Sequence, residues 1–322
     1  MRIFKTAIGV AACLLAGAAL ADDYPSRPVT VIVAFPPGGS SDVIGRVVAQ
    51  ALTKKLRQSF IVENRSGFGG NVGVKYASRA AKDGYTLLMC AVTAASIGQT
   101  LTPEQTNYNL ESDFAPISML GKAPLALVVN ASVPANSLSE FIAFAKQKSK
   151  QVTFSSAGIG TTQHLGGELF ELMTGAQLLH VPYKGSGPSM TDLLGGQVQS
   201  TFETGPAIAP FLKNPKLRIL TYANEMRSTV MPEVPTATEA GLPGFTVAAT
   251  YGLLAPAGTP QAIIDKLNAE VKELLNLPEV KSTLAQQGVE PTYTTPTQTS
   301  TQIHGEIAKW AKVIKYANVK VE

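Results

Sequence analysis

The sequence predicts an α/β protein of two lobes, in which mainly parallel sheets are flanked by helices. Short apolar runs such as 29–33, VTVIV, alternate with helical stretches along the chain, and this order is typical of parallel sheets. Two units of strand, glycine loop and helix, 29–48 and 151–170, lie more than a hundred residues apart. The apolar segments 124–130 and 246–256 can carry the chain between lobes and back.

These two segments set the predicted domain boundaries. A chain that crosses out and later returns has a discontinuous first lobe, so we expect helices near 260–275 and 296–316 to pack back on the N-terminal part. A length of about 300 residues after processing suits two medium-sized domains. The predicted parts are a signal peptide, 1–21; a first lobe, 22–123 and 254–322; and a second lobe, 124–253, with hinge crossovers near 124–130 and 246–253.

The N-terminus has the layout of a cleaved secretory signal. Arg2 and Lys5 precede the apolar stretch TAIGVAACLLAGAALA, which ends in the small-residue site Ala19-Leu20-Ala21. The alternative is a lipoprotein modified at Cys13, which would leave a very short apolar core. We expect an exported protein that lies in the periplasm.

Composition excludes several classes of partner. Removing the leader leaves 25 basic and 23 acidic side chains, and no basic segment with interleaved aromatic residues predicts nucleic-acid binding. The histidines His164, His180 and His304 have no metal-ligand spacing. Cys90, alone after processing, is expected to be a buried free thiol. We expect a monomer with no metal and no cofactor.

The segment AFPPGGSSD, 34–42, raises the first functional hypothesis. It follows VTVIV and precedes a helix near 42–56. Backbone amides at Gly38 and Gly39 can approach a ligand closely, and the helix start offers a seat for an anion. Ordinary capping by Ser40 and Asp42 is the plain alternative.

The segment GFGGNVG, 67–73, also follows a strand-like run, FIVEN. Its glycines, at 67, 69, 70 and 73, depart by one residue from the dinucleotide-binding spacing. A tight turn with a helix start explains them, so we expect no nucleotide cofactor here.

Several longer segments resemble one family. YPSRPVTVIVAFPPGGSSD, VENRSGFGGNVG, HVPYKGSGPSMTDLLGGQVQ, MPEVPTATEAGLPGF and YGLLAPAGTPQAIIDKLNAE are similar to the tripartite tricarboxylate transporter solute receptors, also called the Bug family. The resemblance covers nearly the whole mature chain in order. It implies a type II-like periplasmic binding protein fold, whose cleft captures a small organic carboxylate for the membrane components of a tripartite tricarboxylate-type transporter.

The resemblance also implies which residues bind the ligand. In the family a loop from each lobe grips the carboxylate mainly through backbone amides. The first-loop candidates are Phe35, Gly38, Gly39, Ser40 and Asp42, and the facing candidates are Gly158, Gly160 and Thr161; Thr93, Tyr183 and Lys184 are second-rank.

Two stretches depart from the family pattern. Glu203 and Thr204, in TFETGPA, stand where Asp and Asn are common, and AVTAAS stands where an Asn-rich turn is usual. Both are expected to line the cleft, so Glu203 and Thr204 complete the candidate ligand-binding set. The identity of the ligand is the property that transfers least from the resemblance.

Some residues have a structural role as their alternative. Asp42 and Thr161 are also good helix caps, His164 suits helix packing, and Lys184 suits a solvated loop. We expect no enzyme, because no nucleophile elbow or carboxylate pair is recognisable. An exported hydrolase using Ser155 or Ser156 with His164, and a sensor for a signalling partner, remain the alternative functions.

Overall fold

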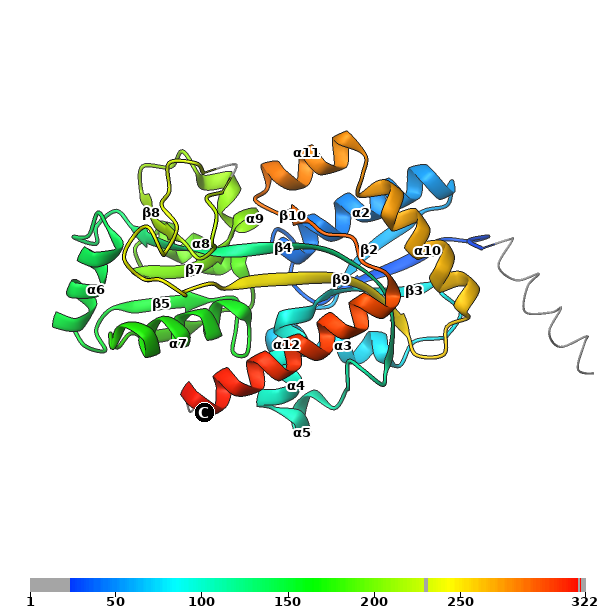
Figure 1. Ribbon diagram of the computed structural model, residues 1–322, viewed down its shortest axis with the longest axis horizontal. Helices are drawn as coiled ribbons and strands as arrows, with labels where there is room; N and C mark the ends of the chain where they lie inside the picture. The colour runs from blue at the N-terminus through cyan, green and yellow to red at the C-terminus, as the bar shows by residue number, and fades with distance from the viewer. Residues whose placement is uncertain (1–23, 229–230, 318, 320–322) are drawn as a thin grey trace, which may run out of the picture.

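The computed structural model describes residues 24–228, 231–317 and 319 and places the strands in two groups joined by two long strands. Figure 1 shows these groups side by side along the long axis, with β4 (Phe114–Asn130) and β9 (Ala248–Pro256) running through the middle. The predicted signal peptide, 1–21, lies outside the described residues. The strand order is β2-β1-β3-β9-β4-β7-β5-β6, with β8 and β10 also paired to β4.

The first group is built around β1 (Val29–Val33), which pairs in parallel with β2 and β3 on its two sides. Alternate residues of this strand reach opposite faces, so Val31 and Val33 enter one apolar core and Ile32 enters another. Both faces are therefore covered by helices. The remaining elements of this part are α2 (Ser40–Leu56), β2 (Phe60–Asn64), η1 (Phe68–Gly70), α3 (Asn71–Ser78), β3 (Thr86–Ala91), α4 (Val92–Leu101) and α5 (Pro103–Thr106).

Strand β4 belongs to both groups. It pairs with β9 from Phe114 to Pro124, and with β7 and β8 from Leu125 to Asn130. The change of partners falls within the segment where the sequence predicts one crossover. Rotation of the two groups about this point stays a prediction.

The second group also has parallel strands at its edge, because β5 pairs in parallel with β6 and β7. Its core joins Phe154, Phe170, Phe202 and Phe245, whose rings contact one another. The elements are α6 (Leu138–Gln147), β5 (Thr153–Ser156), α7 (Thr162–Thr174), β6 (Leu179–Pro182), α8 (Ser186–Leu194), β7 (Ser200–Thr204), α9 (Gly205–Ile208), η2 (Ala209–Phe211) and β8 (Leu217–Tyr222).

The C-terminal helices return to the first group, and the last one reaches further than we expected. In α12 (Pro296–Ala317), Ile303 packs in a core of the first group, whereas Trp310 packs in the core of the second. The helix therefore contacts both groups, as Figure 1 shows. The other elements here are α10 (Gln261–Leu274), α11 (Pro278–Gln286) and β10 (Glu290–Pro291).

Within the described ranges, no helix is both long and apolar enough to cross a membrane. Residue Cys90, on β3, is fully buried with a free thiol. Burial raises the pKa of this thiol to about 12, because a thiolate is poorly solvated in an apolar core.

We expect Cys90 of the protein spanning 22–322 to resist thiol reagents near neutral pH, because it is both inaccessible and protonated. A disulfide reagent that releases a coloured thiol should report almost no reaction in the folded state. It should report one equivalent after unfolding in concentrated guanidinium chloride. Rapid labelling of the folded protein would contradict this burial.

Candidate functional site

A small cavity lies where four helices begin. Its lining includes the N-cap or first-turn residues of α2, α4, α7 and α8, which come from both groups of strands. Each helix N-terminus carries unpaired backbone N–H groups and a partial positive charge. The lining residues of this inner cavity are Phe35, Pro36, Gly39, Ser40, Ser41, Ala91, Ala94, Ala157, Thr162, Gln163, Ser186, Ala249 and Tyr251.

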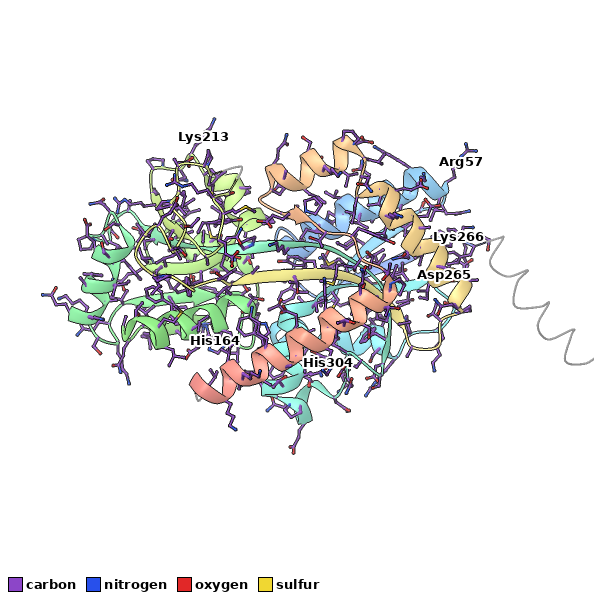
Figure 2. All side chains as sticks on the ribbon, viewed as in Figure 1. Arg57, His164, Lys213, Asp265, Lys266 and His304 are labelled. Atoms are coloured by element: carbon purple, nitrogen blue, oxygen red, sulfur yellow. The ribbon has the colours of Figure 1, made fainter. Side chains whose placement is uncertain are left out.

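Among the described residues, no Lys, Arg, Asp or Glu lines this inner cavity. Figure 2 shows the labelled cations Arg57, Lys213 and Lys266 at the outer edges of the molecule. The described lining of the inner cavity therefore offers an anion the partial positive charge of helix N-termini and no cationic side chain.

The loop before α2 is held by its own helix. Asp42 is buried, and its carboxylate accepts hydrogen bonds from the Gly38 amide (3.1 Å), Arg46 Nε (3.0 Å) and Asn64 Nδ2 (2.9 Å). Burial alone would raise the pKa of Asp42, but these hydrogen bonds outweigh it and hold the pKa below its ordinary value. Asp42 thus shapes the loop, while Gly39 and Ser40 face the cavity.

The facing loop repeats this arrangement. The Gly160 amide donates to His164 Nδ1 (3.2 Å), four residues along, and the Thr161 hydroxyl caps α7 by accepting from the His164 amide (3.4 Å). Thr162 and Gln163, the next residues, line the inner cavity. In each lobe, one predicted glycine amide is therefore engaged by a side chain of its own helix.

A second cavity adjoins the first and shares Phe35, Pro36 and Ala157 with it. The cavity volume accessible to water is ≈ 30 Å³ for the inner cavity and ≈ 200 Å³ for the outer one. A single water needs about 10–15 Å³ by this measure, so the inner cavity has room for a group of carboxylate size. The outer lining includes Gly67, Phe68, Gly69, Gly70, Gly158, Ile159, Pro182, Tyr183 and Lys184.

The two second-rank candidates of the outer cavity differ in what they offer. The phenol of Tyr183 donates to Asp192 Oδ2 (2.7 Å), so its hydroxyl is engaged and its ring forms the wall. Lys184 is exposed at the rim. Neither residue lines the inner cavity.

A buried polar cluster connects the lobes beside the inner cavity. The hydroxyl of Ser40, on α2, is hydrogen-bonded to that of Thr204, on β7. The neighbouring Glu203 accepts from the Thr204 amide (2.8 Å) and from Gln163 Nε2 (2.9 Å). Tyr251 lies beside Ser40 and Thr204. Glu203 and Thr204, which were expected to line the cleft, thus lie behind the wall of the inner cavity.

The hydroxyl of Thr93 does not reach the inner cavity. It is bonded to Thr250 Oγ1 (2.8 Å) and donates to Glu306 Oε2 (2.8 Å). The lining residues of the same helix start are Ala91 and Ala94, which are three apart and share a helix face. The structure therefore brings Phe35, Gly39 and Ser40 together on the cavity and leaves Thr93 apart.

The loops of the two lobes approach each other at glycines. A Cβ on Gly69 would lie 2.5 Å from the Ile159 carbonyl oxygen, and one on Gly185 would lie 2.9 Å from Pro36. Gly69 and Gly185 also have positive φ angles, 62° and 137°. Glycine is needed at both places, because any side chain would hold the lobes apart.

Comparison with known proteins agrees with this geometry. Residues 44–319 match the family model described as the tripartite tricarboxylate transporter family receptor. Protein BugT of Bordetella pertussis is 40% identical over 316 residues, which cover 98% of this chain and 97% of BugT. The chain belongs to this receptor family. The resemblance noted in the sequence is confirmed, and so is the two-lobed fold of periplasmic binding proteins.

Two solved structures of similar proteins are described with small dicarboxylates. Rpa4515 of R. palustris, described with adipate, is 34% identical with a TM-score of 0.88, and the match covers 92% of this chain and 99% of that one. MatC of Rhodopseudomonas palustris, described with bound malate, is 32% identical with a TM-score of 0.85, over 90% and 100%.

The family is one of receptors and not of enzymes, and the serine and histidine positions of this receptor fit that assignment. Ser156 is fully buried, and its hydroxyl pairs with His180 Nε2 (2.7 Å) and not with His164. His164 and His180 stack with ring centroids 4.1 Å apart. In the part of the chain that is described, no group of three His, Cys, Asp or Glu could hold a metal.

Sequence reasoning missed several lining residues of this family member. Gln163 and Ser186 follow glycine loops at the first or second position of α7 and α8. The same position-based signal that selected Ser40 would have selected them. Gly69 carried no such signal, because its role depends on a loop that is far away in the sequence.

The Gly69 contact yields a test with a matched control. We expect Gly69→Ala to keep the lobes further apart, because its Cβ would meet the Ile159 carbonyl. Small-angle scattering should report a larger radius of gyration than for the unmodified protein. Gly175→Ala is the control, since Gly175 has a similar φ of 69° and nothing within 4 Å of its Cβ position. Equal radii for all three proteins would contradict the expected effect.

Proposed function

We propose that this protein is a periplasmic receptor that captures a small organic carboxylate and delivers it to the membrane components of a tripartite tricarboxylate-type transporter. The observation that carries the proposal is the meeting of four helix N-termini at a cavity with no cationic side chain in its described lining. Family membership and the dicarboxylates described with two similar proteins support it.

The two cavities suggest how affinity and selectivity are divided. We infer that the ligand carboxylate occupies the inner cavity, with backbone amides near Gly39, Ser40 and Thr162 as donors. The body of the ligand then lies in the outer cavity, against Tyr183 and Lys184. Selectivity among carboxylates would depend mainly on the outer residues, because the helix N-termini treat every carboxylate alike.

One prediction of this proposal concerns the charge of the ligand. Malate and adipate should bind far more tightly than malamide and adipamide, because only the acids offer charged acceptors to the amide donors. Each charged hydrogen bond contributes about 1.5–3 kcal/mol, so losing two costs about a hundredfold or more in affinity. Isothermal calorimetry measures both affinities. Equal affinity for an acid and its amide would contradict the proposal that the protein binds a carboxylate.

A second prediction separates the loop from the nearby lysine. Gly39→Val should abolish binding, because the added methyl groups would enter the inner cavity near Pro36 and Ser186. Gly39 has an ordinary φ of −86°, so valine adds no left-handed strain. Lys184→Ala should weaken binding by less than about tenfold, or 1.4 kcal/mol.

The comparison requires equal unfolding midpoints, measured first in urea. If a folded Gly39→Val protein binds as well as the unmodified one, the ligand carboxylate must bind outside the inner cavity. Complete loss of binding in Lys184→Ala would mean that a side-chain cation holds the charge.

A further inference from the structure

Glu203 is an acidic side chain directly behind an anion site. It lies near the carboxyl end of β7 and is 0% exposed. Its neighbours Gln163 and Ser186 both line the inner cavity. Adjacent Thr204 carries the hydrogen bond to Ser40 that crosses between the lobes. The charge of Glu203 therefore affects the electrostatic potential in the cavity and the hydrogen bonds at the contact between the lobes.

Only one of the two carboxyl oxygens is well satisfied. Oε1 accepts from the Thr204 amide (2.8 Å), the Thr204 hydroxyl (3.1 Å) and Gln163 Nε2 (2.9 Å). Oε2 makes no hydrogen bond within the described part of the chain. The hydroxyl of Ser186 lies close enough to the carboxyl group to oppose a rise in its pKa. A buried carboxylate oxygen without a donor is costly, whereas a protonated one gains an O–H group and loses its charge.

The charged groups on the surrounding helices are engaged elsewhere. On α7, His164 lies beside Glu168 (3.5 Å). On α2, Asp42 pairs with Arg46 (2.9 Å), and on α8, Asp192 accepts from Tyr183. The remaining titratable neighbour is the phenol of Tyr251, on β9, which is itself buried. Among the described residues, no cation pairs with Glu203.

Burial raises the pKa of Glu203, and the polar groups of Thr204, Gln163 and Ser186 only partly oppose this. An anion in the inner cavity would add a second negative charge to the same enclosed space. Two like charges that share a site disfavour each other, so a bound carboxylate shifts the pKa of Glu203 further upward.

We propose that Glu203 is a proton-linked positioning residue, which takes up a proton from solvent and becomes a neutral carboxylic acid when an anionic ligand occupies the inner cavity. This inference rests on the proposed function. Neutral Glu203 holds Gln163 and Thr204 in place without repelling the ligand. Its deprotonation opposes ligand binding.

The direction of the pH dependence follows from this linkage. Glu203 binds a proton more tightly in the complex than in the free protein. Affinity for a fully ionised acid is therefore constant at low pH and falls as the pH rises through the interval between the two pKa values. The steepest fall that one proton allows is tenfold per pH unit.

Calorimetry with malate and adipate tests proton uptake. Titrations should run at about pH 6 and about pH 8, above the ordinary carboxyl range, in two buffers with different ionisation enthalpies. The unmodified protein should give buffer-dependent heats that correspond to uptake of up to one proton, with weaker binding at the higher pH. Glu203→Gln should bind with buffer-independent heats and no such fall. Glu225→Gln is the control, because Glu225 is exposed and should behave as the unmodified protein.

Binding of malate or adipate without proton uptake would overturn the proposal, and so would the same pH dependence in Glu203→Gln. Urea unfolding without ligand provides an independent readout. The pKa of Glu203 is higher in the native protein than in the unfolded chain, so the unmodified protein should lose stability relative to Glu203→Gln as the pH rises from the unfolded-chain pKa to the native pKa.

These two measurements separate the inference from the proposed function. If neither acid binds, the proposed function fails for these acids, while the unfolding curves still report on Glu203. If the stability of the two proteins changes with pH in the same way, the raised pKa of Glu203 is contradicted. If the stability of the unmodified protein falls more steeply as the pH rises, it is supported.

Discussion

The site depends on the partial positive charge where helices begin. Four helices, α2, α4, α7 and α8, direct their first turns at one small cavity. Amides at these positions have no partner within their helices, so they remain available to an anion. The parallel strands cause this convergence, because the connections at their carboxyl ends lead directly into helices. The fold itself therefore makes the cavity attractive to an anion.

Side chains of these helices fix the loops and leave the cavity to the backbone. Asp42 and His164 each engage a glycine amide four residues earlier, so the two loops have matching local support. The negative charge of Asp42 is compensated by Arg46, and its carboxylate accepts a hydrogen bond from Asn64, so it adds little repulsion to the site. Glu203 has no such compensation, and this difference makes its protonation state important.

Much of the fold and part of the site could be predicted from the sequence. The run VTVIV places apolar residues on both faces of a strand, and the structure shows a strand that is covered on two sides. The first glycine loop was placed correctly beside a helix start, where Gly39 and Ser40 line a cavity. The orientation of Thr93 was not predictable, because a shift of one residue at a helix start turns a side chain away from a site.

Contacts between lobes were beyond the reach of sequence patterns. Gly69 meets Ile159, about ninety residues away, only because the two loops are brought together by the strands that join the lobes. The same applies to Trp310, whose helix pattern does not reveal that it crosses into the second core. Such residues are specified by tertiary arrangement and not by local period.

An anion site made from main-chain amides affects how the ligand specificity of related proteins can evolve. A point substitution removes a side chain, but it leaves the peptide groups at the starts of α2 and α7 in place. If the body of the ligand lies in the outer cavity, as proposed, a duplicated copy of this protein could exchange Tyr183 or Lys184 and accept a different carboxylate without any change in these amides. In this architecture the helix-start amides are retained by every copy that keeps the fold, whereas the side chains of the outer cavity are free to change.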